Sequence, residues 1–287
     1  MLFFIGAAVV VFCVFGSYMA AGGHMAILFQ PFEFLIICGA AVGAFIIGNP
    51  KAVIGATLKS LKKLVKGSAY NKSSYLELLS LLYAVCKLVK SKGVLAIEAH
   101  VEKPDDSTLF QQFPTFHHDH HMVAFLCDYL RLWTLGTDNP HEVEALMDEE
   151  IETHHHEQLA VSDAVQSMAD AMPALGIVAA VLGVIHTMGS ISEPPEVLGH
   201  LIGAALVGTF AGILISYGFI APMASSLKAT FNAESKYLFC IKAGLLAHMN
   251  GCAPAVTIEF ARKTLTSDVR PTFYEVEEAV AQLPAPA

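Results

Sequence analysis

Two long apolar runs near the middle of the sequence most constrain what this chain can fold into. They extend over 169–189 and 199–224, and a short polar loop containing Pro194 and Pro195 joins them. Each run is close to the length of about 20 residues that a helix needs to cross a bilayer. The sequence therefore predicts a transmembrane helical hairpin.

Small residues and prolines distinguish this hairpin from a simple anchor. Gly208 and Gly212 have the small-xxx-small spacing that lets helix backbones approach closely in lipid, where apolar burial does not drive association. Each run also carries one proline, Pro173 and Pro222, which removes an intrahelical hydrogen bond and tends to kink the helix. We expect a bent and closely packed pair of helices.

Two further spans are predicted before the hairpin. The first covers 1–21, and its opening MLFFIGAAVV has no basic residue to begin a cleaved signal peptide, although cleavage near Gly23 is the alternative. The second covers 32–47. Because 54% of the residues are hydrophobic and only 15% are charged, the composition is that of a polytopic membrane protein. The predicted fold class is an all-α membrane protein with four transmembrane helices, a large helical cytoplasmic insert between helices 2 and 3, and a helical cytoplasmic tail.

The positions of the lysines predict the orientation in the membrane. The connections 22–31 and 190–196 contain neither lysine nor arginine. By contrast, five lysines follow the second span: Lys51, Lys59, Lys62, Lys63 and Lys66. The positive-inside rule places this segment in the cytoplasm, and both termini with it. Since its apolar residues recur at helical spacing, the segment can also lie on the inner leaflet as an amphipathic helix.

The predicted organisation has four segments: transmembrane helices 1 and 2 (1–50), a cytoplasmic helical domain (51–168), transmembrane helices 3 and 4 (169–225) and cytoplasmic C-terminal helices with a tail (226–287). Within the insert, helical spacing over 70–101 is interrupted at Gly93 and resumes over 122–132. A helix beginning near Pro140 is expected to continue into the third span. The fourth span is expected to continue to Asn250 and Gly251. One more helix is expected around 258–265, before a disordered end at 284–287.

The middle of each span lacks acidic and basic residues. The nearest acids, Glu33, Asp163 and Asp170, lie at or beyond the predicted span ends. Because proteins that move cations through lipid generally need a buried ionisable group, the chain is either a structural bundle or one wall of an ion path completed by another polypeptide. The hairpin hydroxyls either pair between helices or bond back to the preceding turn: Thr187, Thr209, Ser216 and Tyr217.

Several function classes are excluded. The net charge of −9 argues against nucleic acid as a partner, and the six scattered cysteines indicate neither disulfides nor a zinc site. No nucleophile with a paired base and no phosphate loop are present, so neither an enzyme nor a cofactor is expected. Histidines cluster at 117–121 and 154–156, but adjacent histidines on a helix point in different directions and no HExxH motif is present. Solvated loop histidines with some pH sensitivity are therefore predicted, rather than a metal site.

Two stretches of the hairpin resemble a known family. The runs DAMPALGIVAAVLGVIHTMG (170–189) and HLIGAALVGTFAGILISYGFIAPMA (200–224) resemble the third and fourth spans of MotA, the stator family of flagellar motors. The four-span layout also matches, and it separates MotA from its three-span relatives ExbB and TolQ. The resemblance covers essentially the whole chain.

The resemblance implies an assembly in the bacterial inner membrane. Copies of the chain are expected to form a homo-oligomeric ring, a pentamer, around paired helices of a MotB-like single-span subunit. That partner is expected to supply the ion-carrying aspartate and a periplasmic domain that binds peptidoglycan. This expectation agrees with the lack of a carboxylate in the middle of the spans.

The resemblance also implies residues of the proton path and of conformational coupling. Pro173 matches a proline near the partner's aspartate, Thr209 matches a hydroxyl that lines the path, and Pro222 is expected to take part in the conformational change. The alternative for both prolines is a kink needed only for packing. At Ala180, sodium-driven relatives have a threonine. Because alanine offers no oxygen ligand to a dehydrated sodium ion, protons are expected to be the coupling ion.

Three charged residues are candidates for the rotor interface. Lys90 and Glu98 match a basic and an acidic residue that contact the rotor protein FliG in the family, and Glu150 matches a further acid. Taken alone, Lys90 and Glu98 read as a solvated helix face, and Glu150 as part of an acidic helix turn. Lysine replaces the arginine that is common at position 90, so planar bidentate pairing is lost and a weaker or differently arranged contact is expected.

The predicted function is therefore that of a flagellar stator subunit, which with MotB forms a proton channel and converts proton flow into torque. An ExbB or TolQ type energiser of envelope proteins is the nearest alternative, since it shares the proton path but not the rotor contact. A non-conducting membrane scaffold is the third.

Overall fold

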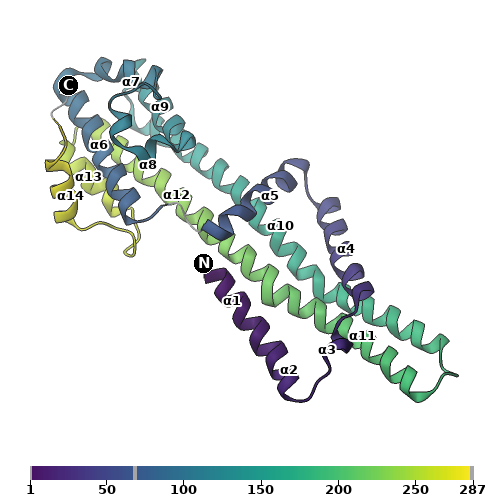
Figure 1. The fold of residues 1–287 in the computed structure, drawn as a ribbon. Coiled ribbons are helices and arrows are strands. Elements are labelled where there is room, and N and C mark those ends of the chain that lie inside the picture. Colours follow the sequence, from purple (N-terminus) through teal and green to yellow (C-terminus); the bar gives the residue numbers. More distant parts are fainter. Residues whose placement is uncertain (1, 67–69, 285–287) are drawn as a thin grey trace. The chain divides into compact units, whose positions relative to one another are not determined.

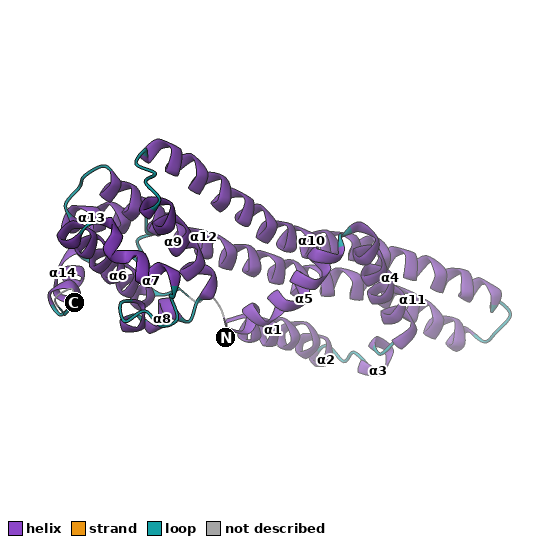
Figure 2. Cartoon of the chain, turned by 90° about the horizontal axis from the view of Figure 1, so that it is seen from above, coloured by secondary structure: helices purple, strands orange, loops and turns teal. Residues whose placement is uncertain are grey.

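The computed structural model describes residues 2–66 and 70–284, and the secondary structure of this part of the chain is entirely helical (Figure 2). The end predicted to be disordered, apart from Pro284, lies outside the described residues. The α-helices are α1 (Leu2–Val11), α2 (Ser17–Ala20), α3 (Met25–Leu28), α4 (Pro31–Gly48), α5 (Lys51–Lys66), α6 (Lys72–Lys92), α7 (Glu98–Glu102), α8 (Pro114–His117), α9 (His120–Thr134), α10 (Pro140–Gly189), α11 (Pro195–Ile215), α12 (Ala221–Met249), α13 (Pro254–Lys263) and α14 (Phe273–Ala281). Two 3₁₀ turns, η2 (Val94–Ile97) and η3 (Phe110–Gln112), and two π-helices, η1 (Phe12–Gly16) and η4 (Ser216–Ile220), complete the set.

Four helical stretches among the described residues are long and apolar enough to cross a membrane. They are Phe3–Ala20, Met25–Gly48, Pro140–Gly189 and Pro195–Met249. All four predicted spans are thus confirmed, with helical segments between the second and the third. The predicted continuous helix into the third span is also confirmed, because α10 runs through Pro173 as one helix of 50 residues.

The chain divides into two compact units. Unit 1 comprises Met1–Gly67 and His156–Phe231, and unit 2 comprises Ser68–His155 and Asn232–Ala287. The long helices α10 and α12 each contribute residues to both units.

In unit 1, the hairpin of α10 and α11 lies at the centre of the apolar spans, and Figure 1 shows the two helices side by side. A small buried cluster of Ile37, Ala179 and Ala211 joins α4 to this pair. The lysine-rich α5 is amphipathic, as predicted. Its Leu64 is buried with Val165, Leu227 and others, whereas Lys59 and Lys62 are exposed.

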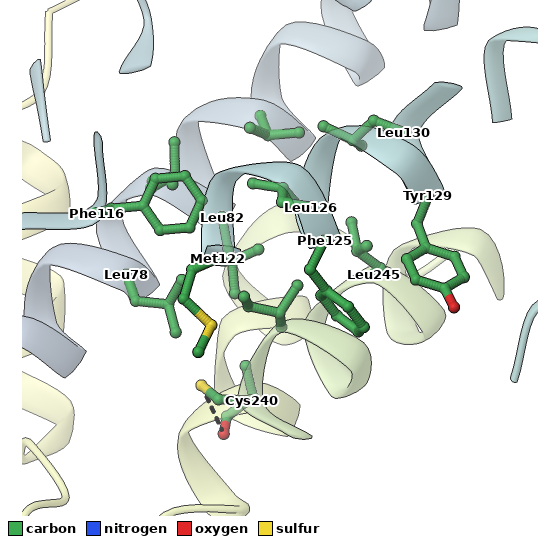
Figure 3. Packing of buried hydrophobic residues seen from close by; sticks show 14 of the residues in the cluster. Leu78, Leu82, Phe116, Met122, Phe125, Leu126, Tyr129, Leu130, Cys240 and Leu245 are labelled. Atoms are coloured by element: carbon green, nitrogen blue, oxygen red, sulfur yellow. Dashed lines mark hydrogen bonds between the residues drawn. The ribbon is translucent and has the colours of Figure 1, made fainter. Parts of the chain in front are cut away.

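In unit 2, apolar side chains of α6, α9, α12 and α13 form a continuous core (Figure 3). Leu78, Leu82 and Leu126 are fully buried in it. Asn71 caps the start of α6 by accepting a hydrogen bond of 3.0 Å from the Ser74 backbone N–H. The helix ends at Gly93, whose φ of +86° favours glycine, so the predicted interruption at this residue is confirmed.

The C-terminal segment differs from its prediction. The helix expected around 258–265 begins earlier, at Pro254, because proline suits the first turn of a helix. The sequence analysis missed α14, although Thr272 and Glu275 form a complete capping box at its start. That spacing is a local signal that could have predicted the helix.

Candidate functional site

The two helices of the hairpin meet backbone to backbone. A Cβ atom added at Gly176 of α10 would lie 2.8 Å from the carbonyl oxygen of Gly208 on α11. A Cβ atom added at Gly212 would lie 2.7 Å from the carbonyl oxygen of Met172. Since real Cβ atoms do not approach backbone oxygens so closely, only glycine fits at these two positions. The predicted close packing of the hairpin through small residues is present.

The same contact continues along α10 for two further turns. A Cβ atom at Gly183 would lie 2.7 Å from the Cβ atom of Ala205. At 1.5 Å of rise per residue, the seven residues from Gly176 to Gly183 extend the contact over about 10 Å. Thr187 bonds back to its own helix, because its hydroxyl donates to the Gly183 carbonyl at 2.8 Å.

Three of the four residues predicted for the proton path lie along this contact. The Cα atom of Thr209 would be 3.4 Å from a Cβ atom at Gly176, and the backbone nitrogen of Ala180 would be 3.2 Å from a Cβ atom at Gly208. Pro173 directly follows Met172, whose carbonyl faces Gly212. The hairpin therefore positions residues 173, 180 and 209 through contacts of its own backbone.

Pro222 lies elsewhere in unit 1. It follows the π-helix η4, in which the Ala221 N–H donates to the Ser216 carbonyl five residues earlier. Proline has no N–H to donate, and a π-helix is a known way to accommodate a break in the hydrogen-bond ladder. Pro222 is exposed and lines a groove of about 360 Å³ with Val10 of the first span and Gly218.

The π-helix is anchored to the third span. The buried Ser216 hydroxyl donates a hydrogen bond of 2.6 Å to the Ala169 carbonyl of α10. Of the two alternatives for this hydroxyl, pairing between helices is the one observed. The wide turn beside Pro222 is thus joined to the hairpin by a polar contact.

One ionisable residue that was predicted to lie at a span end contacts the hairpin. Glu33 lies in the first turn of α4, and its Oε2 would be 3.2 Å from a Cβ atom at Gly208. Sequence alone assigns this acid to a helix start, where negative charge suits the helix dipole. Its approach to α11 depends on the packing of two spans far apart in sequence.

In unit 2, the candidate rotor residues Lys90 and Glu98 are both exposed. Lys90 lies in the last turn of α6 and Glu98 begins α7, so the two charges flank the turn at Gly93. Lys90 is close enough to His248 for its charge to help lower the pKa of that histidine, although burial is the larger cause.

Glu150, also exposed, lies on α10 rather than at this turn. Its Oε2 accepts a hydrogen bond of 2.6 Å from the Tyr129 hydroxyl. Burial raises the pKa of Tyr129 above its ordinary range, and the bond to Glu150 raises it further. The carboxylate is therefore held in place by a neutral phenol.

The clustered histidines lie mostly in helices, so their predicted position in loops is wrong. His120 and His121 are in the first turn of α9, and His154, His155 and His156 are inside α10. Apolar residues at helical spacing continue beyond these histidines, so the helices include them. The rings of His121 and His154 stack with centroids 4.3 Å apart. The described residues contain no group of histidine, cysteine or acidic side chains arranged to hold a metal ion.

Comparison with known proteins identifies the family. Residues 4–93 match the model of the motility protein A N-terminal region, and residues 117–238 match that of the MotA/TolQ/ExbB proton channel family. The chain is 45% identical to motility protein A of Salmonella typhimurium over 280 residues, which cover 98% of this chain and 95% of that protein. The chain belongs to the motility protein A family. It is also 36% identical to the chemotaxis protein LafT of Vibrio parahaemolyticus over 97% of this chain and 98% of that protein.

Solved structures agree with this family. The fold matches the Bacillus subtilis flagellar MotAB stator complex with a TM-score of 0.71 and 26% identity, over 89% of this chain and 92% of that one. It matches the C. jejuni MotAB structure with a TM-score of 0.77 and 20% identity, over 93% and 96% of the chains. The chain is thus a multi-pass membrane protein. Membership of the motility protein A family confirms the predicted function as a stator subunit of a proton channel. The function is therefore not that of an enzyme. The ExbB or TolQ alternative and the scaffold alternative are set aside.

Proposed function

We propose that this chain forms a ring of identical copies, a pentamer, around a pair of MotB-like helices in the bacterial inner membrane. The main support is the 45% identity to a motility protein A over nearly the whole chain. The solved relatives described as MotAB complexes support the choice of partner. The partner supplies the aspartate that carries the proton, and its periplasmic domain holds the ring to peptidoglycan.

In this proposal, the proton path runs beside the α10–α11 contact. Pro173 and Thr209 lie next to the partner's aspartate, and Ala180 leaves the path without the oxygen ligand that a dehydrated sodium ion requires. Protonation of the aspartate removes a charge from a low-dielectric environment. The hairpin responds at the π-helix and Pro222, where the helical ladder is already interrupted.

The proposed topology places both termini, 51–168 and 226–287 in the cytoplasm, where the exposed Lys90 and Glu98 contact complementary charges of the rotor protein FliG. Glu150, held by Tyr129, is a further rotor-facing acid. The support is the exposure of Lys90 and Glu98 on either side of the turn at Gly93, together with the match of all three residues to charged positions of the family.

Deletion of the gene tests the function. We expect paralysed cells with intact flagellar filaments, seen by motility tracking and electron microscopy, and recovery of swimming when the chain is supplied again. Normal swimming in a strain without a second stator set, or a defect confined to the envelope or iron uptake, would contradict the proposal.

Charge reversal tests the rotor contact. Lys90→Glu is expected to reduce swimming speed at least fivefold, because like charges then face each other, and reversal of the partner charge on FliG is expected to restore at least half of it. Lys103→Glu, at an exposed lysine just after α7, is the matched control and is expected to swim normally. Equal effects of the two substitutions, or no recovery with any reversed rotor charge, would argue against the contact.

A further inference from the structure

Glu33 is the one acidic or basic residue of the second span. It lies within the apolar stretch Met25–Gly48, in the first turn of α4. From there its carboxylate crosses to α11, because Oε2 would be 3.2 Å from a Cβ atom at Gly208. The side chain is thus directed toward the hairpin and not along its own helix.

The Glu33 side chain as a whole is half-exposed, and one of its two carboxylate oxygens is buried. Within the described part of the chain, Oε2 of Glu33 is shielded from solvent and has no hydrogen-bond partner. The segments 34–48, 171–185 and 201–227 contain no Asp, Glu, Lys, Arg or His, and the nearest such residues of the hairpin are Asp170, His186 and His200. A buried carboxylate oxygen without a partner is costly, and acids inside apolar spans generally mark ion or proton pathways.

The surroundings of Glu33 coincide with the candidate proton path. The position that its oxygen approaches, Gly208, is also 3.0 Å from the Ala179 Cβ atom and 3.2 Å from the Ala180 nitrogen, measured from an added Cβ atom. Thr209 is the next residue of α11. The Glu33 carboxylate of the second span and the Ala180 backbone of the third therefore both lie close to Gly208 of the fourth span, the residue before Thr209.

We propose that Glu33 is a proton-binding relay of the channel, supplied by this chain in addition to the partner's aspartate. Its carboxylate accepts a proton from a hydronium ion entering from the side of the 22–31 connection, which forms one O–H bond and leaves a water molecule. The carboxylic acid then gives that proton, through water, to the partner's carboxylate and returns to its charged form. This inference rests on the proposed function, because it adds a group to the path assigned there.

A purely structural role makes the opposite prediction for two substitutions. If Glu33 acts only by filling space or by hydrogen bonding, Glu33→Gln keeps its size and is tolerated, whereas Glu33→Asp shortens the side chain and is not. If Glu33 carries protons, Glu33→Gln fails because an amide does not titrate. Glu33→Asp then retains function because the carboxyl group remains.

The experiment measures the rotation of single motors with a small bead, at low load, in cells that lack their own stator genes and produce this chain with the MotB of the same organism. Speed is read per stator unit from the discrete steps as units join the motor, so a smaller amount of folded protein does not alter the readout. Glu196→Gln, at an exposed acid in the first turn of α11, is the matched control.

We expect at least a fivefold loss of speed per unit for Glu33→Gln, at least half of the wild-type speed for Glu33→Asp, and no change for Glu196→Gln. Wild-type speed for Glu33→Gln, or equal loss for both Glu33 variants, would overturn the relay. Absence of rotation with the unaltered chain would instead contradict the proposed function itself, so the two failures are distinguishable.

Discussion

At the scale of single residues, glycines decide how closely the two hairpin helices approach. Gly176 and Gly212 face backbone atoms of the other helix at distances that no Cβ atom tolerates, whereas Gly199 of α11 has open space around its Cα atom. The first two are required by a contact between helices, and the third is not. Sequence spacing alone marks Gly208 and Gly212 but does not show which atoms they meet.

Gly176→Ala is therefore expected to destabilise the hairpin by about 1–3 kcal/mol, the usual cost of overpacking, and to reduce rotation. Gly199→Ala is the control, and it is expected to be neutral or to stabilise by up to about 1 kcal/mol, because alanine is the better helix former. Thermal unfolding of the detergent-solubilised complex measures both. Equal stability of the two variants would show that the helices separate at no cost.

A second contact at this scale is the hydrogen bond from the Tyr129 hydroxyl, which fixes the orientation of the Glu150 carboxylate. Tyr129→Phe removes one hydrogen bond to a charged group. We expect a loss of stability of at most about 3 kcal/mol, because Glu150 is exposed and can bind water instead. If Glu150 faces the rotor, swimming speed falls as well. Wild-type speed in Tyr129→Phe and in Glu150→Gln would remove Glu150 from the proposed rotor surface.

At the scale of elements, the tail helix α14 is held by its own capping box and by an ion pair. Glu275 accepts from Lys72 of α6 at 2.7 Å and from the Thr272 backbone N–H at 2.6 Å. The Lys72 ammonium is the larger cause of a pKa lowered from 4.5 to about 2, and the bonds from Thr272 add to it. The charged form of this carboxylate therefore contributes to the attachment of α14, beside the buried Val276.

The pH dependence follows from this lowered pKa. Because the folded state favours the ionised group, the contribution of Glu275 is fully present above pH 4.5 and is lost as the pH falls toward about 2. Hydrogen exchange of the α14 amides, corrected for intrinsic rates, is expected to lose protection in that window. Glu275→Gln is expected to lack this step, and Glu278→Gln, at an exposed acid of the same helix, to retain it. Loss of protection at the same pH in both variants would contradict the assignment.

Also at this scale, hydropathy and helix punctuation predicted most of the elements. The four spans follow from apolar length, and the ends at Gly93 and Gly251 follow from glycines with positive φ. The π-helices were not predicted, because Phe12–Gly16 and Ser216–Ile220 have the composition of ordinary helix. A widened turn depends on neighbours such as Ala169, which accepts from Ser216 across the hairpin.

At the scale of the whole molecule, the family could be predicted from the sequence, whereas the approach of Glu33 to the α10–α11 hairpin could not. Residues 180 and 209 were assigned by resemblance, and only the packing of three spans shows that Glu33 approaches Gly208, which also lies close to Ala180. Its chemistry was visible in the sequence, but its partners come from segments more than 140 residues away. Long-range packing of this kind leaves no local pattern.

The central claim is that this chain converts proton flow into rotation. The most direct measurement follows the speed of single motors driven by this chain and its MotB, while the proton gradient and the sodium gradient are varied separately. We expect speed to follow the proton gradient, to vanish with a protonophore and to stay constant when sodium is removed, in keeping with alanine at position 180. Rotation that follows sodium, or that persists after the proton gradient has collapsed, would contradict the account.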